Sequence, residues 1–115
     1  MRRLSKYNAR KVTMFGITFD SKKEADRYLE LRAMQDAGKI VSLRTQVPYV
    51  VIEKTSKFRE VKYYADFVYY LITNHFGPVL TVEDVKGYRK GVAYDLFKIK
   101  QKLMYLKWGI EVIEI

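Results

Sequence analysis

The sequence contains no cysteine, which excludes disulfide bonds, thiolate zinc sites and cysteine nucleophiles. Its one histidine, His75, lies in a turn and excludes the paired-histidine motifs of zinc hydrolases. No apolar run approaches the roughly 20 residues of a membrane-spanning helix, and the charged first residues lack the apolar stretch of a secretory signal. We therefore expect no membrane partner and a reducing, cytoplasmic environment.

The chain also lacks the proline-rich or glycine-rich stretches that separate domains. It has 2 prolines and 6 glycines among 115 residues, and no internal repeat. Hydrophobic residues make up 49% and charged residues 30%, a balance that is typical of a globular domain. We expect a basic N-terminal arm over residues 1–11 and a single domain over residues 12–115.

Acidic residues are fewer than basic ones, 13 against 22, which leaves a formal net charge of +9. The excess is uneven, because residues 1–11 hold five bases and no acid, and residues 89–115 hold six bases and three acids. This distribution predicts a polyanionic partner, whose phosphates would provide affinity that does not depend on base sequence. The alternative is a solubilising surface with a basic tail.

The spacing of apolar residues predicts an α/β domain with a central mixed sheet flanked by helices and a short hairpin in front. A capping box at Ser21 and Glu24 begins the first helix, and Gly38 ends it. Leu96, Ile99, Leu103 and Leu106 form the apolar stripe expected on the second helix. The expected elements are a hairpin at 12–19, a helix from 21 to about 37, strands at 47–53, 61–71 and 79–86, a helix at 92–108 and a strand at 110–114.

Charged residues interrupt the two most apolar strands. Asp66 is the one acid within residues 61–71, whereas Glu83, Asp84 and Lys86 all lie within residues 79–86. Because strand side chains alternate, Asp84 and Lys86 share one face and Glu83 points to the other. If the two strands pair, Asp66 can lie across from Asp84, where two carboxylates repel each other and resist ionisation.

Two acids and a lysine on one sheet face are a minimal site for metal-assisted phosphodiester hydrolysis. Carboxylate oxygens hold Mg²⁺, which polarises a phosphate and acidifies a bound water, and a lysine stabilises the developing charge. Glu24, one turn into the first helix, is a candidate third acid. Each residue also has a structural interpretation: Asp84 and Lys86 as a solvated ion pair, Asp66 as the partner of a nearby lysine, and Glu24 as a capping residue.

Other polar residues are weaker candidates. Gln46 precedes the strand at 47–53 and either enters the site or forms hydrogen bonds at the start of that strand. Lys98 and Gln101 share a polar stripe of the second helix that faces DNA, the site or solvent. The candidate DNA-binding residues are the bases of the arm, the loop and the second helix: Arg2, Arg3, Lys6, Arg10, Lys11, Arg89, Lys90, Lys98 and Lys102.

The spacing of these residues resembles the signature of the PD-(D/E)XK nuclease superfamily. Asp66 corresponds to its first acid and Asp84-Val85-Lys86 to its (D/E)-x-K element, while Ala65 replaces the usual proline. Along almost the whole chain, the sequence is similar to small phage and prophage proteins catalogued as a domain of unknown function and related to phage-type endonucleases and Holliday junction resolvases. The similar segments are SKYNARK, FGITFDSKKEADRY, Gln46, YYADFVYY, VEDVKG and YLKWGIEVIEI.

The resemblance implies a restriction-endonuclease-like core in the order αβββαβ and a requirement for Mg²⁺ or Mn²⁺. Carried over by position, Asp66, Asp84 and Glu24 would be catalytic metal ligands and Lys86 the catalytic lysine. A bulge in the strand would bring Glu83 to the metal in place of Asp84.

The implied function is a DNA endonuclease that acts on branched or otherwise structured DNA in phage recombination or replication, in the cytoplasm of a bacterial host. Because cutting two strands needs two sites, we also expect a homodimer. One alternative is a nucleic-acid-binding module with a nuclease-like fold and no catalysis. Another is a structural adaptor protein of phage replication.

Overall fold

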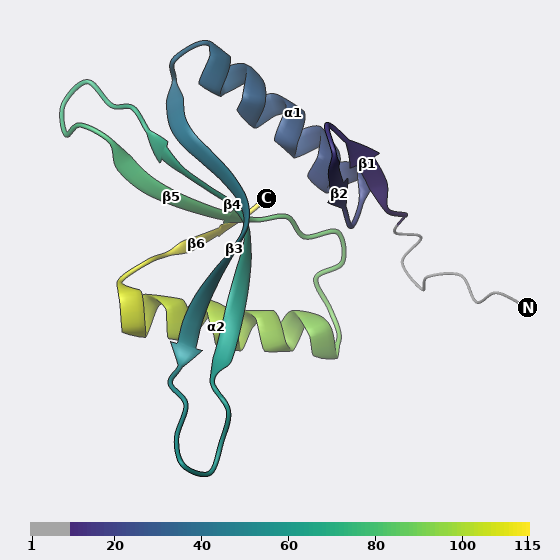
Figure 1. Ribbon diagram of the computed structural model, residues 1–115, viewed down its shortest axis with the longest axis vertical. Coiled ribbons are helices and arrows are strands. Elements are labelled where there is room, and N and C mark those ends of the chain that lie inside the picture. Colours follow the sequence, from purple (N-terminus) through teal and green to yellow (C-terminus); the bar gives the residue numbers. More distant parts are fainter. Residues whose placement is uncertain (1–9) are drawn as a thin grey trace, which may run out of the picture.

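Two helices flank a four-stranded mixed sheet, and a separate two-stranded hairpin precedes them (Figure 1). This computed structural model describes residues 10–115, so most of the predicted basic arm, including Arg2, Arg3 and Lys6, lies outside the described residues. No helix within the described residues is long and apolar enough to cross a membrane. The elements are β1 (Val12–Met14), β2 (Ile17–Phe19), α1 (Lys22–Asp36), β3 (Ile40–Ile52), β4 (Val61–Leu71), β5 (Val79–Asp84), α2 (Val92–Trp108) and β6 (Val112–Glu114).

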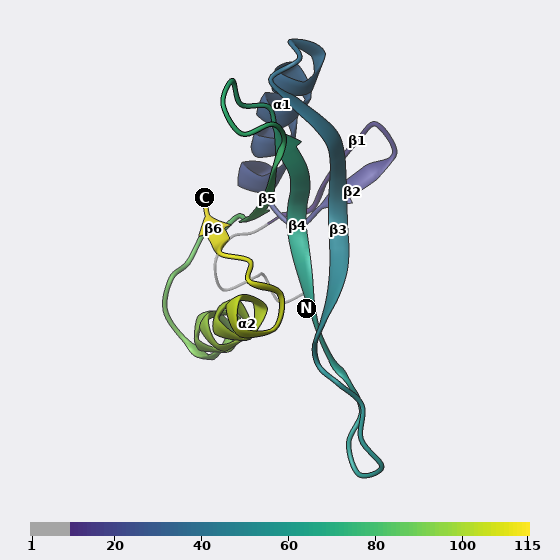
Figure 2. The same cartoon turned by 90° about the vertical axis from the view of Figure 1, so that its left-hand side faces the viewer.

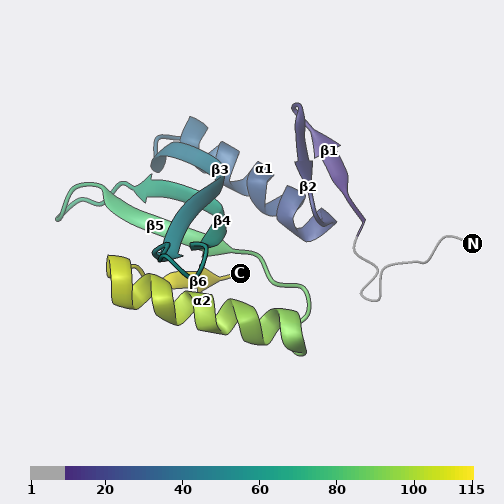
Figure 3. The same ribbon diagram turned by 60° about the horizontal axis from the view of Figure 1, so that its bottom comes forward.

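The sheet has the strand order β3-β4-β5-β6, and the α/β class predicted from the sequence is confirmed. The first three strands are antiparallel neighbours, whereas β6 joins β5 in parallel after the crossover through α2. Figure 3 shows the sheet between the two helices. In the β4–β5 pair Phe67 lies opposite Glu83, and Asp66 and Asp84 are the next residues along the two strands beyond this last pair.

Helix α1 begins at the predicted cap. The side-chain oxygen of Ser21 accepts a hydrogen bond from the backbone N–H of Glu24 at 3.1 Å, and the Glu24 carboxylate accepts one from the backbone N–H of Asp20 at 3.3 Å. The helix is followed by Gly38 at φ +76°, a left-handed conformation that suits glycine. The capping box therefore fixes both the start of the helix and the direction of the Glu24 side chain.

Two hydrophobic cores meet on β4. The core beneath α1 contains Phe67 and Tyr69, whereas the core beneath α2 contains Tyr63, Ala65 and Val68. In a regular strand Ala65 and Phe67 would share one face, so the alternation of β4 is broken between them. Asp66 thus stands at the boundary between the two cores, where it has access to solvent that neither core provides.

Three predicted features differ from the structure. Strand β3 begins at Ile40 rather than at residue 47, because an irregular segment around Ser42, at φ +58°, hides the period of two. Strand β5 ends at Asp84 and β6 begins at Val112, so both are shorter than predicted, and Lys86 follows β5.

The apolar stripe predicted for α2 is wrong for three of its four residues, whereas Leu103 packs against the core. Phe97 and Met104 are the buried residues of this helix, whereas Leu96, Ile99 and Leu106 are exposed, Leu106 by 77%. The buried residues and the predicted stripe both have helical spacing. Which of the two faces of α2 is buried depends on the shape of the sheet. The rings of Phe97 and Tyr63 pack against each other, with their centroids 6.3 Å apart.

Candidate functional site

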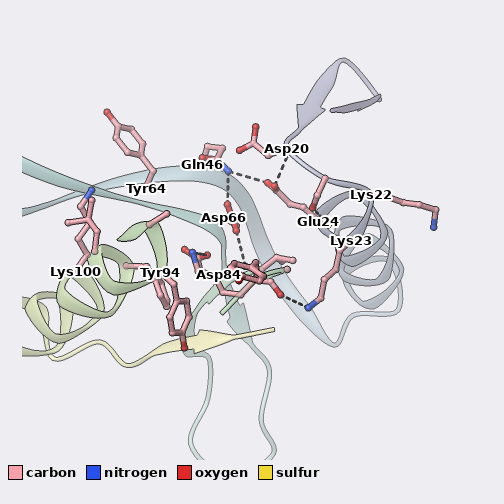
Figure 4. A pocket seen from close by; sticks show the side chains of 18 of the residues that line it. Asp20, Lys22, Lys23, Glu24, Gln46, Tyr64, Asp66, Asp84, Tyr94 and Lys100 are labelled. Atoms are coloured by element: carbon pink, nitrogen blue, oxygen red, sulfur yellow. Dashed lines mark hydrogen bonds and ion pairs between the residues drawn. The ribbon is translucent and has the colours of Figure 1, made fainter. Parts of the chain in front are cut away.

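A cleft of about 1200 Å³ opens between the first turn of α1, the end of β5 and the first half of α2. Figure 4 shows that Asp66 and Asp84 lie close together in its centre, with Gln46 and Glu24 beside them. The cleft is lined by four acids, Asp20, Glu24, Asp66 and Asp84. It is also lined by six bases: Arg10, Lys22, Lys23, Lys86, Lys90 and Lys100.

Asp66 is held by neutral donors. Its Oδ1 accepts a hydrogen bond from Nε2 of Gln46 at 2.9 Å, and its Oδ2 accepts one from the backbone N–H of Val85 at 2.8 Å. Burial, followed by the negative charges of Asp84 and Glu24, raises the pKa of Asp66 to about 7. Negative charge is therefore crowded at this point, and within residues 10–115 Asp66 forms no ion pair with a lysine, which was the alternative interpretation.

Asp84 is 5% exposed and is held from two sides. The hydroxyl of Tyr63 donates to its Oδ2 at 2.5 Å, and Nζ of Lys86 lies 2.8 Å from its Oδ1. The Lys86 ammonium also lies 3.8 Å from the centre of the Phe97 ring, which is a cation–π contact. The ion pair between Asp84 and Lys86 thus forms as the structural interpretation predicted, but on the floor of the cleft rather than in solvent.

Glu24 has both of the roles considered from the sequence. Its Oε2 caps the helix, while its Oε1 accepts a hydrogen bond from Nε2 of Gln46 at 3.2 Å. The same amide nitrogen donates to Asp66, so Gln46 joins the two carboxylates. Burial raises the pKa of Glu24, and the hydrogen bond from the backbone of Asp20 partly offsets that rise.

Glu83 points to the opposite face of β5 and is 1% exposed. Its oxygens accept hydrogen bonds from Nε of Arg27 at 2.8 Å and from Nη2 at 2.6 Å, and the hydroxyl of Tyr69 donates to it as well. This bidentate ion pair fastens α1 to β5. Asp84, and not Glu83, therefore faces the cleft, which resolves the alternative register.

Lys98 and Gln101, which the sequence indicated as possible site neighbours, are not among the residues that line the cleft. Lys98 Nζ lies 3.0 Å from a carboxylate oxygen of Glu114, and Gln101 donates to the backbone carbonyl of Val112 at 2.9 Å. Both side chains turn toward β6, which offers these acceptors. Among the candidate DNA-binding residues, Arg10 and Lys90 line the cleft, Arg89 lies 4.0 Å from Glu114, and Lys11 and Lys102 are exposed elsewhere.

Sequence reasoning missed Tyr63, Lys23 and Lys100. Tyr63 lies in an aromatic strand, where a tyrosine is usually a core residue. Only the hydrogen bond from its hydroxyl to Asp84 shows that it also holds a side chain of the cleft. Lys23 donates to the backbone carbonyl of Lys86 at 2.6 Å, which ties α1 to the loop after β5. For Lys23, the sequence offered one indication of a place near the site, namely its position directly before Glu24.

No three carboxylate or histidine side chains in the described part of the chain converge into a ready metal-binding group. The donor chemistry nevertheless fits a hard divalent cation, because Mg²⁺ is usually bound by one or two carboxylates and keeps several waters. Asp66 and Asp84, which both line the cleft, are the two residues that would hold such an ion. Glu24 is separated from them by the Gln46 amide.

The sequence of the chain was also compared with known proteins. The family described as "Protein of unknown function (DUF1064)" matches residues 4–113. No curated protein and no solved structure matches the chain. The matched residues include Glu24, Gln46, Asp66, Asp84 and Lys86, so the whole floor of the cleft lies within the family's pattern.

Proposed function

The chain belongs to the DUF1064 family, and we propose that it is a metal-dependent DNA endonuclease that hydrolyses phosphodiester bonds. The observation that carries the proposal is the meeting of Asp66, Asp84 and Lys86 on the floor of a cleft with a basic rim. Crowded, buried carboxylates destabilise a fold unless a ligand compensates them. Carboxylates perturbed in this way are characteristic of functional sites.

Each residue on the cleft floor has a role in this proposal. Asp66 and Asp84 would hold Mg²⁺ or Mn²⁺, which, when bound, polarises the scissile phosphate and lowers the pKa of a water. Lys86 carries the positive charge that stabilises charge developing on the phosphate. Tyr63 orients Asp84, and Gln46 orients Asp66 together with Glu24.

The rim of the cleft supports a nucleic-acid substrate. Arg10, Lys22, Lys23, Lys90 and Lys100 line it, and such bases bind phosphates without reading sequence. We propose branched DNA as the substrate class, by resemblance to Holliday junction resolvases, and phage recombination or replication in a bacterial cytoplasm as the setting. A homodimer would place two such clefts on one substrate.

A panel of labelled DNA structures tests the proposal. Purified protein is incubated with four-way junctions, flaps and linear duplexes in Mg²⁺ or Mn²⁺, and we expect branched DNA to be cut. Lys86→Ala should bind DNA as the wild type does, yet cut it about 100-fold or more slowly, as expected when a charge-stabilising group is removed. If no DNA is cut, and Asp84→Asn behaves as the wild type does, the chain is not this enzyme.

One observation favours a second function, a nucleic-acid-binding module without catalysis. The Lys86 ammonium already neutralises Asp84, and residues 10–115 present no preformed metal-binding group. This module would bind DNA with a strong dependence on salt and take up no metal. Calorimetric titration with Mn²⁺ distinguishes the two, since uptake that Asp66→Ala abolishes favours the enzyme. Failure to bind any DNA at low salt would favour a structural adaptor instead.

A further inference from the structure

Strands β3 and β4 form a two-stranded ribbon whose end reaches α2, and the loop that joins them, residues 53–60, projects from the body of the protein (Figures 1 and 2). The C-terminal end of α2 supports this ribbon. The indole N–H of Trp108 donates to the backbone carbonyl of Val50 at 3.0 Å, and Lys107 forms an ion pair with Glu53. The ribbon therefore has a defined direction relative to the body.

The tip of the ribbon, residues 53–60, holds Phe58 in an ordered turn. The backbone N–H of Thr55 donates to the carbonyl of Phe58 at 2.9 Å, and the Thr55 hydroxyl accepts hydrogen bonds from the N–H groups of Lys57 and Phe58 at 3.1 and 2.9 Å. The Phe58 side chain is nevertheless 72% exposed. A large ring that is held in place by its backbone but packs on no core is available to a partner.

The charges around Phe58 indicate the chemistry of that partner. Lys54, Lys57 and Arg59 lie within the tip, and none of them forms an ion pair with another described residue. Of the two acids in the tip, Glu53 is neutralised by Lys107, and Glu60 remains. An aromatic ring among bases suits a ligand with flat apolar surfaces on an anionic backbone, which is a nucleic acid.

The ribbon connects the tip to the cleft. On the outward side of β4, Lys62 and Tyr64 are exposed, and Tyr64 also lines the cleft. Phe58 lies in the turn, so the strand part of this stretch runs from residue 61 to residue 64 and spans about 10 Å at about 3.3 Å per residue. The tip is therefore joined to the edge of the cleft by a short length of extended chain.

We propose that the β3–β4 hairpin is a second DNA-contacting element, in which Phe58 stacks on an unpaired base while Lys54, Lys57 and Arg59 bind the flanking phosphates. The inference rests on the proposed function, because it names the part of the DNA that the endonuclease engages away from its cleft. Unpaired or unstacked bases occur at branch points and strand ends. The hairpin thus recognises the branch, and the cleft acts on the duplex arm beside it.

The test compares Phe58→Ala with a matched control, Phe76→Ala. Phe76 is 85% exposed in the β4–β5 turn, and no lysine or arginine lies within residues 72–78. DNA binding is measured without divalent metal, on a flap that carries a fluorescent base analogue at its branch point and on a linear duplex. We expect Phe58→Ala to weaken flap binding about 5- to 150-fold, as for one stacked base, with little change on the duplex.

Phe76→Ala should bind the flap as the wild type does, and Phe58→Trp should retain the fluorescence change of the base analogue. If the wild type neither binds nor cuts DNA, the proposed function fails and the hairpin proposal fails with it. If the wild type binds the flap, and Phe58→Ala binds it equally well, the hairpin proposal alone is overturned. Equal losses on flap and duplex would also refute stacking on an unpaired base.

Discussion

The ion pair between Arg27 and Glu83 allows a prediction that does not depend on any ligand. Glu83 is 1% exposed, and its charge is met by the bidentate guanidinium of Arg27 and by the hydroxyl of Tyr69. Arg27→Met removes the cation but leaves the carboxylate buried. We expect this substitution to lower the free energy of unfolding by about 3–5 kcal/mol, the usual cost of an uncompensated buried charge.

The double variant Arg27→Met/Glu83→Leu separates the ion pair from simple packing. Removing both charges leaves no buried ion, so the double variant should recover most of the stability that Arg27→Met loses. Urea denaturation of the wild type, both single variants and the double variant gives the coupling energy of the pair. The reasoning is refuted if Arg27→Met costs less than about 1 kcal/mol, the range of an exposed pair. It is also refuted if the double variant is no more stable than Arg27→Met.

Three further predictions concern the cleft and the assembly. Because its surroundings raise the pKa of Asp66 from 3.8 to about 7, the folded chain keeps a proton that the unfolded chain releases. Stability of the metal-free protein should therefore fall as pH rises from about 4 to above 7, by up to about 4 kcal/mol from Asp66. Asp66→Asn should make this slope markedly shallower in urea titrations with chelator, and Glu24, whose pKa is also raised, contributes the remainder. Tyr63→Phe removes the hydroxyl that holds Asp84, so cleavage should slow about 10-fold or more while flap binding persists, and an unchanged rate would contradict an orienting role. Sedimentation should give a dimeric mass in the presence of junction DNA; a monomer both with and without DNA would argue against the dimer.

The sequence predicts those elements best in which local pattern and tertiary environment agree. Strand β4 over residues 61–71 and helix α2 over residues 92–108 have the predicted bounds, because β-branched and aromatic residues fill the strand and Gly109 ends the helix. The antiparallel pairing of β4 with β5 also follows from the sequence, because neighbouring strands joined by a short turn are antiparallel.

What the sequence leaves open is the choice of long-range partners. Arg27 and Glu83 are 56 residues apart, and Tyr63 and Asp84 are 21 apart, so no local pattern links them. The face of α2 was assigned wrongly because two apolar stripes have the same helical spacing and only the sheet selects between them. These contacts depend on which faces meet in the fold, and that information lies outside a local window.

One of the three non-glycine residues with positive φ in residues 10–115 lies opposite Asp66. By register Gln46 faces Asp66, and its backbone has φ +51°, which costs roughly 1–3 kcal/mol for a residue other than glycine. A glycine at this position would relieve the strain but could not supply the amide that donates to both Glu24 and Asp66. At this position the amide of Gln46 therefore accompanies a strained backbone, a combination that is expected of a binding site under the proposed function.

The consecutive acids Glu83 and Asp84 link the stability of the fold to the geometry of the cleft. Alternation along β5 sends Glu83 beneath α1, where Arg27 holds it, and turns Asp84 toward Lys86. Arg27 lies one helical turn after Glu24, so the ion pair that fastens α1 to β5 also sets the separation between Glu24 and Asp84. If the cleft is the site of chemistry, variants that loosen the Arg27–Glu83 ion pair must lose activity while the chain is still folded. Equally destabilising substitutions in the core beneath α2 must leave the position of Glu24 unchanged.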